Sequence, residues 1–247
     1  MDEIYIAFIL FFAGVAASFI NMMAGGGSMI TIGSMIMLGI DPQVANATNR
    51  IGVLVGTGTG AAAFKSEKFT DLKTSLLLGL CAIPGAILGA IYSINITSEQ
   101  FQKVLAIVMI LIIITMFIPK KKREQSGKSI NKFLIYPAMV LVGIYGGFIQ
   151  VGVGFLLMAA LRHLMSYDLI RVNMHKVFVV LIYTIPVLVL FGLTGKINWM
   201  LAIVMSCGNA LGSWISVKLS IKKGEKFVKI VLAVAIVLMA VKLLVDI

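Results

Sequence analysis

Between two long apolar segments the chain reads NMMAGGGSMITIGSMIMLG over residues 21–39. Its second half contains a comparable stretch, YGGFIQVGVGFLLMAALRHLM over residues 145–165. In each stretch a glycine cluster precedes a short apolar segment, 28–39 or 154–165. As helices these short segments would rise about 18 Å at ~1.5 Å per residue, well short of the ~30 Å hydrocarbon core of a bilayer. Both stretches therefore predict helices that are broken at glycine inside a membrane.

The whole chain has the composition of a membrane protein. Of its 247 residues, 60% are hydrophobic and 13% are charged, whereas a soluble globular domain is roughly 45–50% apolar and about 25% charged. This composition excludes a cytosolic enzyme, a disordered tail and a disulfide-stapled secreted domain. The amino terminus lacks the basic region of a cleaved signal peptide, so the first apolar run is expected to remain as a span. We predict an all-α, polytopic helical membrane protein. Ten apolar segments are expected, at 4–23, 28–39, 44–64, 74–93, 101–118, 133–150, 154–165, 172–194, 197–217 and 227–245.

The basic residues indicate how the chain lies in the membrane. A net charge of +11 would suggest a nucleic-acid partner for a soluble protein, but here the lysines and arginines gather in short loops such as 120–123 and 218–229. Cytoplasmic loops of membrane proteins carry such an excess. We therefore expect the lipid bilayer, and no nucleic acid, as a partner. Ten crossings with the amino terminus outside place both clusters in the cytoplasm. The alternative counts each short segment as half of one broken span, which gives eight crossings and moves one basic cluster outside.

The chain also repeats itself. Shifting residues 21–94 by 127 positions superposes glycines and polar residues beside the short segments, where apolar bias alone cannot produce matches. The halves are then 1–118 and 133–247, joined by a basic cytoplasmic linker, 119–132. Five crossings per half is an odd number, so the halves have opposite orientations, and inverted repeats place a substrate site near the bilayer midplane at their interface. The matched pairs are Gly25 and Gly152, Gly27 and Gly154, Asp41 and Asp168, Asn46 and Asn173, Thr57 and Thr184, and Gly85 and Gly212.

The glycine clusters are the first candidate for the binding site. A helix that begins after such a cluster offers unpaired N–H groups and a positive dipole, and glycine lets a ligand approach the backbone closely. Ser28 is expected to cap the following helix or to give its hydroxyl to a ligand. The alternative is that the glycines only allow a kink and close helix packing. The residues concerned are Gly25, Gly26, Gly27, Ser28, Gly152 and Gly154.

Polar residues gather at the start of the third apolar segment, at Thr48, Asn49 and Arg50. An arginine inside a membrane segment costs ~2.5–3.5 kcal/mol even on insertion scales and should face a cavity or a partner. Its planar guanidinium suits carboxylate, sulfonate or phosphate oxygens. We assign all three residues to the binding site. For Arg50 the alternatives are a side chain that reaches the membrane surface and an ion pair with Asp41.

The equivalent place in the second half holds His175 and Lys176. The repeat sets Lys176 opposite Asn49, so both halves supply a cation at a comparable depth. His175 is able to donate a hydrogen bond to an anion or to exchange a proton. The alternatives are a hydrogen bond from His175 to another helix, and a role for Lys176 and Arg171 as cytoplasmic topology signals.

The acidic residues and cysteines limit the chemistry. The Asp and Glu residues lie at ends of apolar segments or in loops, whereas a cation carrier would need a buried carboxylate. Cys81 and Cys207 lie in apolar segments without metal-ligand spacing and are expected to be buried packing residues. The sequence has no catalytic triad, no paired carboxylates and no phosphate-binding loop motif. Cations and helix N-termini without buried acids predict a small anionic substrate, and neither an enzyme nor a metal or cofactor site.

The same residues carry a resemblance to a known family. The chain resembles TauE/SafE-type permeases over nearly its whole length, in motifs that are specific only when taken together. Members of that family are inner-membrane permeases for sulfite, sulfonates and other organosulfur anions, often exporters, so the resemblance implies anion transport. The chain departs from the family pattern at Arg50, where a lysine is more frequent, and at Ser28, which replaces a further glycine. The motifs are 19–28, 39–42 and 45–50 in the first half, and 146–155, 175–177, 195–199 and 208–212 in the second.

Together these observations predict a secondary carrier for a small sulfur-containing anion such as sulfite or an organosulfonate. The anion would lie between the two glycine clusters, and rocking of one half against the other would expose it alternately to each side. A passive anion channel and a membrane subunit of a sulfur-metabolism enzyme system are the alternatives. The sequence sets neither the oligomeric state nor the direction of transport.

Overall fold

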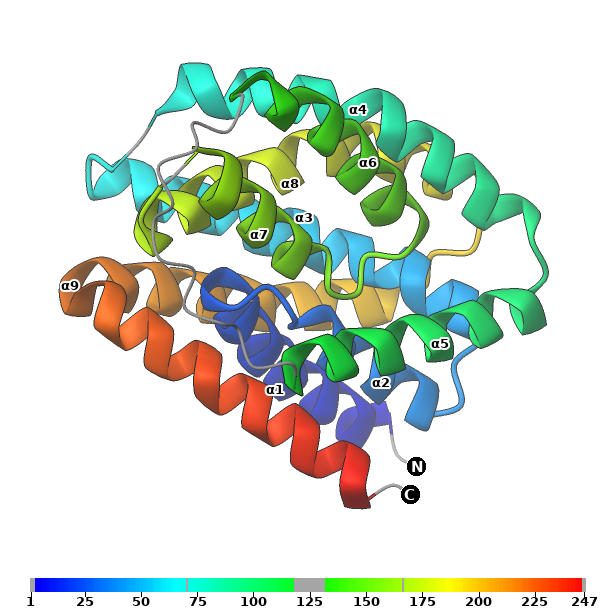
Figure 1. The fold of residues 1–247 in the computed structure, drawn as a ribbon. Coiled ribbons are helices and arrows are strands. Elements are labelled where there is room, and N and C mark those ends of the chain that lie inside the picture. The colour runs from blue at the N-terminus through cyan, green and yellow to red at the C-terminus, as the bar shows by residue number, and fades with distance from the viewer. Residues whose placement is uncertain (1–2, 70, 118–131, 166, 246–247) are drawn as a thin grey trace.

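The computed structural model consists of helices joined by turns (Figure 1). No strand occurs among the residues that it describes, so the all-α prediction is confirmed. The predicted linker 119–132 lies outside these residues except for Lys132. The described residues are 3–69, 71–117, 132–165 and 167–245. The elements are α1 (Glu3–Met23), α2 (Ser28–Met37), α3 (Pro42–Ser66), α4 (Leu72–Asn95), α5 (Ser98–Phe117), the short 3₁₀ turn η1 (Lys132–Leu134), α6 (Ile135–Phe148), α7 (Val153–Met165), α8 (Leu169–Leu193) and α9 (Trp199–Val245).

The last element, α9, is two helices joined at Gly224. There the backbone angles are φ 74° and ψ −173°, which are not helical, and the chain turns back on itself (Figure 1). Glycine adopts a positive φ without the steric cost that a Cβ would bring. With α9 counted as two, the nine α-helices in the described part of the chain make ten segments, in the places that the ten apolar runs predict.

Four helices of the described chain have the length and apolar composition of membrane spans. Their outer faces carry large apolar side chains, for example Phe8 (61% exposed), Leu88 (61%) and Leu193 (82%), which suits lipid rather than water. A helical membrane protein is therefore confirmed, and α2, α6 and α7 are shorter apolar helices within it. The four spans are Ile4–Met23, Leu72–Asn95, Leu169–Leu193 and Trp199–Val228.

Helices of the first half pack mainly on helices of the second. α1 lies against α9, α6 lies against α4, and α3 contacts both α8 and α9 (Figure 1). A Cβ on Gly85 would collide with the Val140 carbonyl of α6, and a Cβ on Gly212 would collide with the Val15 carbonyl of α1. Small residues let helix backbones approach this closely in membranes. Gly85 and Gly212, which the shift of 127 residues pairs, thus serve the same purpose in two interfaces.

Backbone conformations also recur at the spacing of 127 residues. Gly25 and Gly152 both have a positive φ, of 91° and 75°. Lys68 and Gly195, in the turns before α4 and α9, have φ values of 56° and 68°. A positive φ is uncommon outside glycine, so two such pairs at one spacing support the internal repeat. The inverted orientation of the halves stays a prediction.

Aspartates begin three of the helices. Asp41, Asp71 and Asp168 are the N-caps of α3, α4 and α8, and they accept hydrogen bonds of 2.9–3.2 Å from N–H groups of the first turn. The hydrogen bonds from Thr74 hold the pKa of the Asp71 carboxyl below its usual range. Such caps satisfy N–H groups that a helix leaves unpaired, and each stabilises it by about 1 kcal/mol. These acids at segment ends therefore have a structural role.

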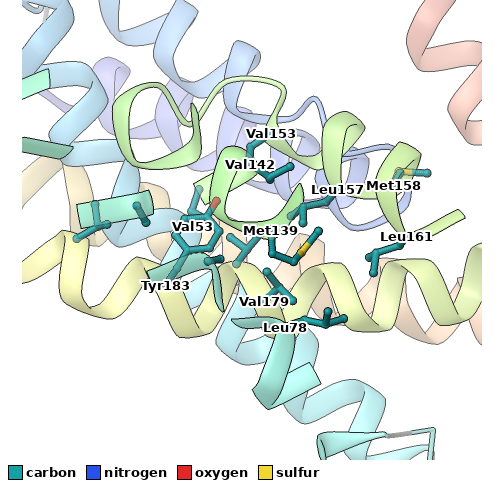
Figure 2. Close-up of a cluster of buried hydrophobic side chains, with 14 of the residues drawn as sticks. Val53, Leu78, Met139, Val142, Val153, Leu157, Met158, Leu161, Val179 and Tyr183 are labelled. Carbon is teal, nitrogen blue, oxygen red and sulfur yellow. The ribbon is translucent and has the colours of Figure 1, made fainter. Parts of the chain in front are cut away.

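The largest apolar core lies between α4, α6, α7 and α8 (Figure 2). Leu78, Met139, Leu157 and Val179, one from each helix, converge there and are at most 1% exposed. Because lipid is as apolar as these side chains, close packing rather than exclusion of water holds them together. This core fixes α7 and α8 beside the glycine break that follows α6.

The prediction for the cysteines is wrong in one case. Cys81 is partly buried against the core just described, but Cys207 is exposed on α9. Residues four apart share a helix face, and the neighbours of Cys207 on its face, Ile203 (62% exposed) and Leu211 (47%), also point outward. An apolar run in a membrane protein has a lipid-facing side as well as a packed one, and composition does not tell them apart.

Candidate functional site

The break between α1 and α2 touches the break between α6 and α7. A Cβ on Gly25 would lie 2.5 Å from the carbonyl carbon of Gly154, and one on Gly154 would collide with the backbone of Gly25. Gly25 also has a φ of 91°, which residues with a side chain rarely adopt. Glycine is therefore required at both positions, and the structure brings the two clusters together. All six predicted residues of the breaks are buried: Gly25, Gly26, Gly27, Ser28, Gly152 and Gly154.

Several backbone N–H groups at these breaks have no acceptor within the described chain. At the start of α2, Met29 donates to the carbonyl of Gly26 at 3.1 Å, and at the start of α7, Phe155 donates to the carbonyl of Gly152 at 3.0 Å. The N–H groups just before these donors remain unpaired. Such groups carry partial positive charge and bind anions. They belong to Gly26, Gly27 and Ser28 before α2, and to Gly152, Val153 and Gly154 before α7.

Ser28 is the first residue of α2 rather than its cap. The N-cap is Gly27, which already has helical angles (φ −61°, ψ −30°) and makes no side-chain hydrogen bond. A serine caps a helix only where its own backbone is still non-helical, so the prediction of a Ser28 cap is wrong. Ser28 lines a hollow in the protein, and the second expected role, contact of its hydroxyl with a ligand, stays a prediction.

Two adjoining hollows open beside the breaks, and we call them together the break cavity. Each has a cavity volume of about 10 Å³, roughly the room that one water molecule needs, and the two share Asn21, Ser28 and Thr57 among their lining residues. The described residues that line them include no Asp or Glu. The cavity is therefore polar without being acidic. Its polar side chains are Ser18, Asn21, Ser28, Thr31, Asn49, Thr57, Gln150, Lys176 and Asn209.

Lys176 is the cation of the break cavity. Its side chain is 2% exposed, and its ammonium donates to the carbonyls of Asn21 (2.8 Å) and Met22 (2.9 Å) and to the amide oxygen of Asn173 (2.8 Å). These acceptors are neutral, and no Asp or Glu of the described residues pairs with the ammonium. The role of topology signal is excluded for the buried Lys176 but suits Arg171, which is exposed and pairs with Asp168.

Arg50 holds the end of α6 instead of lining the break cavity. Its guanidinium donates to the carbonyls of Gly146 (3.2 Å) and Gly147 (2.6 Å) and lies 4.3 Å from the centre of the Phe191 ring. Arg50 is 0% exposed, so it does not reach the membrane surface, and Asp41 instead caps α3. Both alternatives offered by the sequence are excluded. A cation at a helix C-terminus satisfies carbonyls that the helix leaves unpaired.

Each half holds the broken helix of the other. From α3, Asn46 donates to the Phe148 carbonyl at 3.4 Å, next to the carbonyls that Arg50 binds at the end of α6. From α8, Asn173 donates to the Met23 carbonyl at 3.4 Å, next to those that Lys176 binds at the end of α1. Polar backbone groups need such partners at membrane depth. The repeat pairs Asn46 with Asn173, so these contacts are related by the same spacing.

A row of three polar side chains forms part of the cavity wall. The hydroxyl of Thr31 lies 2.6 Å from Oδ1 of Asn49, and Nδ2 of Asn49 lies 3.2 Å from Oε1 of Gln150. Asn49 is therefore at the cavity, as predicted for a site residue, whereas Thr31, Thr57 and Gln150 were missed. The signal for Gln150 was its place as a polar residue between two glycine pairs in an apolar run.

Thr48 and His175 lie away from the break cavity. The hydroxyl of Thr48 accepts a hydrogen bond from the N–H of Asn198 at 3.0 Å. Nδ1 of His175 lies 2.9 Å from the Ser75 hydroxyl of α4, and its ring stacks on Tyr167 with the ring centres 4.9 Å apart. The contact with Ser75 joins α8 to α4, and it is the hydrogen bond to another helix that the sequence predicts as the alternative for His175.

Comparisons with known proteins bear on what this cavity serves. The family model described as "Sulfite exporter TauE/SafE" matches residues 10–243. The probable membrane transporter protein ORF9 of Sinorhizobium sp is 27% identical over 239 residues, which cover 96% of this chain and 92% of that protein. Two more relatives are also described as probable membrane transporter proteins: YfcA of Escherichia coli K12 (27% identical, covering 96% and 89%) and YunE of Bacillus subtilis (24% identical, covering 94% and 93%). No solved structure matches the chain.

Proposed function

This chain belongs to the TauE/SafE family, and we propose that it is a secondary carrier that moves a small sulfur-containing anion, such as sulfite or an organosulfonate, across the membrane. In this proposal the anion binds in the break cavity, against the N–H groups of Ser28 and Gly154 and the ammonium of Lys176. One observation carries the proposal. The buried Lys176, which has no carboxylate partner among the described residues, lies at the same cavity as the starts of α2 and α7.

Electrostatics favour an anion over other solutes here. Each helix start is equivalent to roughly half a positive charge, and Lys176 adds an ammonium whose charge no carboxylate of the described lining offsets. A cation would be repelled, and a neutral solute would gain nothing from the charge. Sulfite and sulfonate groups carry oxygens on several sides, so they can accept hydrogen bonds from α2 and α7 together while lying beside Lys176.

The seam between the halves supports alternating access as the mechanism. Where the two breaks touch, the contact is made by the backbones of Gly25 and Gly154 and not by interlocked side chains. Because α1 packs on α9 and α4 packs on α6, the rigid bodies that rock in this proposal are helix groups drawn from both halves. The cavity lies at this seam, so rocking changes the side of the membrane to which a bound anion is exposed.

The direct test is transport of radiolabelled sulfite by the purified protein in liposomes. We expect Lys176→Met to reduce sulfite flux at least about tenfold, because it removes a positive charge beside the anion. Two opposite charges about 4 Å apart attract by about 4 kcal/mol at an effective dielectric constant of ~20, and ~1.4 kcal/mol is a factor of ten. The matched control is Lys103→Met, which changes an exposed lysine on α5 that pairs with Glu99. Gel filtration measures the folded fraction of each variant.

Two results would count against the proposal. Unchanged flux through folded Lys176→Met would remove Lys176 from the site. Wild-type flux equal to that of empty liposomes for sulfite, sulfate, thiosulfate, taurine and sulfoacetate alike would contradict transport of sulfur-containing anions altogether.

A further inference from the structure

The proposed function leaves one buried polar group of the break cavity unused, the amide of Gln150. This residue lies in the turn between α6 and α7, is 1% exposed, and lines one of the two hollows together with Lys176 and Gly154. Its Nε2 has no hydrogen-bond partner among the residues that the structure describes. A buried donor without an acceptor costs about 1–3 kcal/mol, so such a group in a native protein needs an explanation.

The neighbours of this amide set its orientation. The hydroxyl of Thr31 donates to Oδ1 of Asn49 at 2.6 Å, a usual separation for an O–H···O bond. Nδ2 of Asn49 then faces Gln150 and donates to its Oε1 at 3.2 Å. With Oε1 occupied as an acceptor, the N–H groups of Nε2 are the unpaired part of an amide that lines the cavity.

The charged and dipolar groups around Gln150 are also donors. The ammonium of Lys176 lies in the wall of the same hollow, and Gly154 belongs to the unpaired start of α7. An ammonium group carried by a zwitterionic solute would meet Lys176 here and find no carboxylate in the described part of the wall. Like charges repel strongly in a low-dielectric interior, and such repulsion discriminates between otherwise similar ligands.

We propose that Gln150 binds the transported anion directly, and that Thr31 and Asn49 hold its amide in the donor orientation. The site then selects oxyanions that carry no cationic group, such as sulfite, over zwitterionic sulfonates such as taurine. This inference rests on the proposed function, because it names the substrate class of the same cavity.

The first experiment changes the donor itself. Gln150→Glu keeps the size of the side chain but replaces the N–H donors by a carboxylate, so we expect the affinity for sulfite, measured by calorimetry on the purified protein, to fall at least tenfold. Gln102→Glu makes the same chemical change at an exposed position of α5 and should leave the affinity unchanged. Wild-type affinity in folded Gln150→Glu would overturn the assignment of Gln150 as a ligand.

The second experiment leaves Gln150 in place, so it tests the proposal even if Gln150→Glu does not fold. Thr31→Val removes only the hydroxyl that orients Asn49, so both amides become able to rotate and Oε1 of Gln150 can turn toward the cavity. We expect the ratio of sulfite affinity to taurine affinity to fall severalfold, with a thermal midpoint close to wild type. A purely structural role would lower both affinities equally, and an unchanged ratio would overturn the positioning role.

The wild-type protein separates this inference from the proposed function. We expect a Kd for sulfite at least tenfold lower than that for taurine. Equal Kd values, in a protein that still transports sulfite, would overturn the selectivity and leave the carrier intact. Absence of both binding and transport for every sulfur-containing anion offered would contradict the inference and the proposed function together.

Discussion

Arg50 and Lys176 lie at comparable places in the two halves, yet their side chains have different tasks. The Nη atoms of Arg50 donate to carbonyls at the end of α6, and its Nε has no partner in the described chain. Lys176 lines the break cavity, but its three N–H groups already have acceptors, so it offers a nearby anion its charge. Substitution of Lys176 should therefore lower anion binding as well as stability, whereas substitution of Arg50 should lower mainly stability.

We expect Arg50→Met to lower stability more than affinity. The change leaves the buried carbonyls of Gly146 and Gly147 without a donor, at a cost of about 1–3 kcal/mol each. The thermal midpoint in detergent should fall clearly, while the Kd for sulfite of the folded fraction stays within about threefold of wild type. Arg171→Met, at an exposed ion pair, should hardly change the midpoint. A tenfold weaker Kd at an unchanged midpoint would instead make Arg50 a ligand.

Part of the candidate site could be predicted from the sequence at this scale. The glycine breaks and Lys176 were found because spacing and the internal repeat mark them. The environment of Arg50 could not be predicted, because the position of Arg50 along α3 gives its depth in the membrane but not the residues that its side chain contacts. Gln150 falls opposite Met23 in the repeat, so no matching polar residue pointed to it.

Among the elements, the broken helices matter most for the site. α2 and α7 begin where α1 and α6 have just ended, so carbonyls and N–H groups of four helix ends gather in one region. The carbonyls are satisfied by side chains of α3 and α8, and the N–H groups are left for a ligand. The glycines in the sequence are enough to predict these breaks. The contact between the two breaks joins residues far apart in the chain, so only the structure reveals it.

We expect Gly25→Ala to disrupt this contact. The new methyl group would lie 2.5 Å from the Gly154 carbonyl carbon at a φ of 91°, and backbone strain and overpacking each cost about 1–3 kcal/mol. The thermal midpoint and sulfite binding should both fall. Gly33→Ala is the control, because the same change in α2 meets open space and alanine favours a helix by up to ~1 kcal/mol. Equal thermal midpoints for Gly25→Ala and Gly33→Ala would contradict the backbone contact between Gly25 and Gly154.

For the whole molecule, composition was enough to predict the fold class, since apolar runs of this length leave few alternatives to membrane helices. The ten segments were also found, because each ends at a charged or glycine-containing stretch. Packing partners were not predictable. That α1 lies on α9 and α6 on α4 follows from close glycine contacts between distant residues, which hydropathy does not encode.

The inverted orientation of the halves makes its own prediction. Lys68 and Gly195 occupy equivalent turns with positive φ, and opposite orientations put these turns on opposite sides of the membrane. With Cys81 and Cys207 replaced, single cysteines at the two positions should react with a membrane-impermeant maleimide from opposite sides, Gly195→Cys in intact cells and Lys68→Cys in inside-out vesicles. Labelling of both from one side would show parallel halves.

The central claim is that an anion binds in the break cavity between the two glycine breaks. Crystals grown with selenite, a heavier analogue of sulfite, test it most directly through the anomalous signal of selenium. We expect a peak roughly 4 Å from the hydrogen-bond donors of Ser28 and Gln150 and close to the ammonium of Lys176, since the selenite oxygens that accept the bonds at ~3 Å lie between the donors and the selenium. Peaks confined to the basic surface loops, with none in the break cavity, would contradict the account.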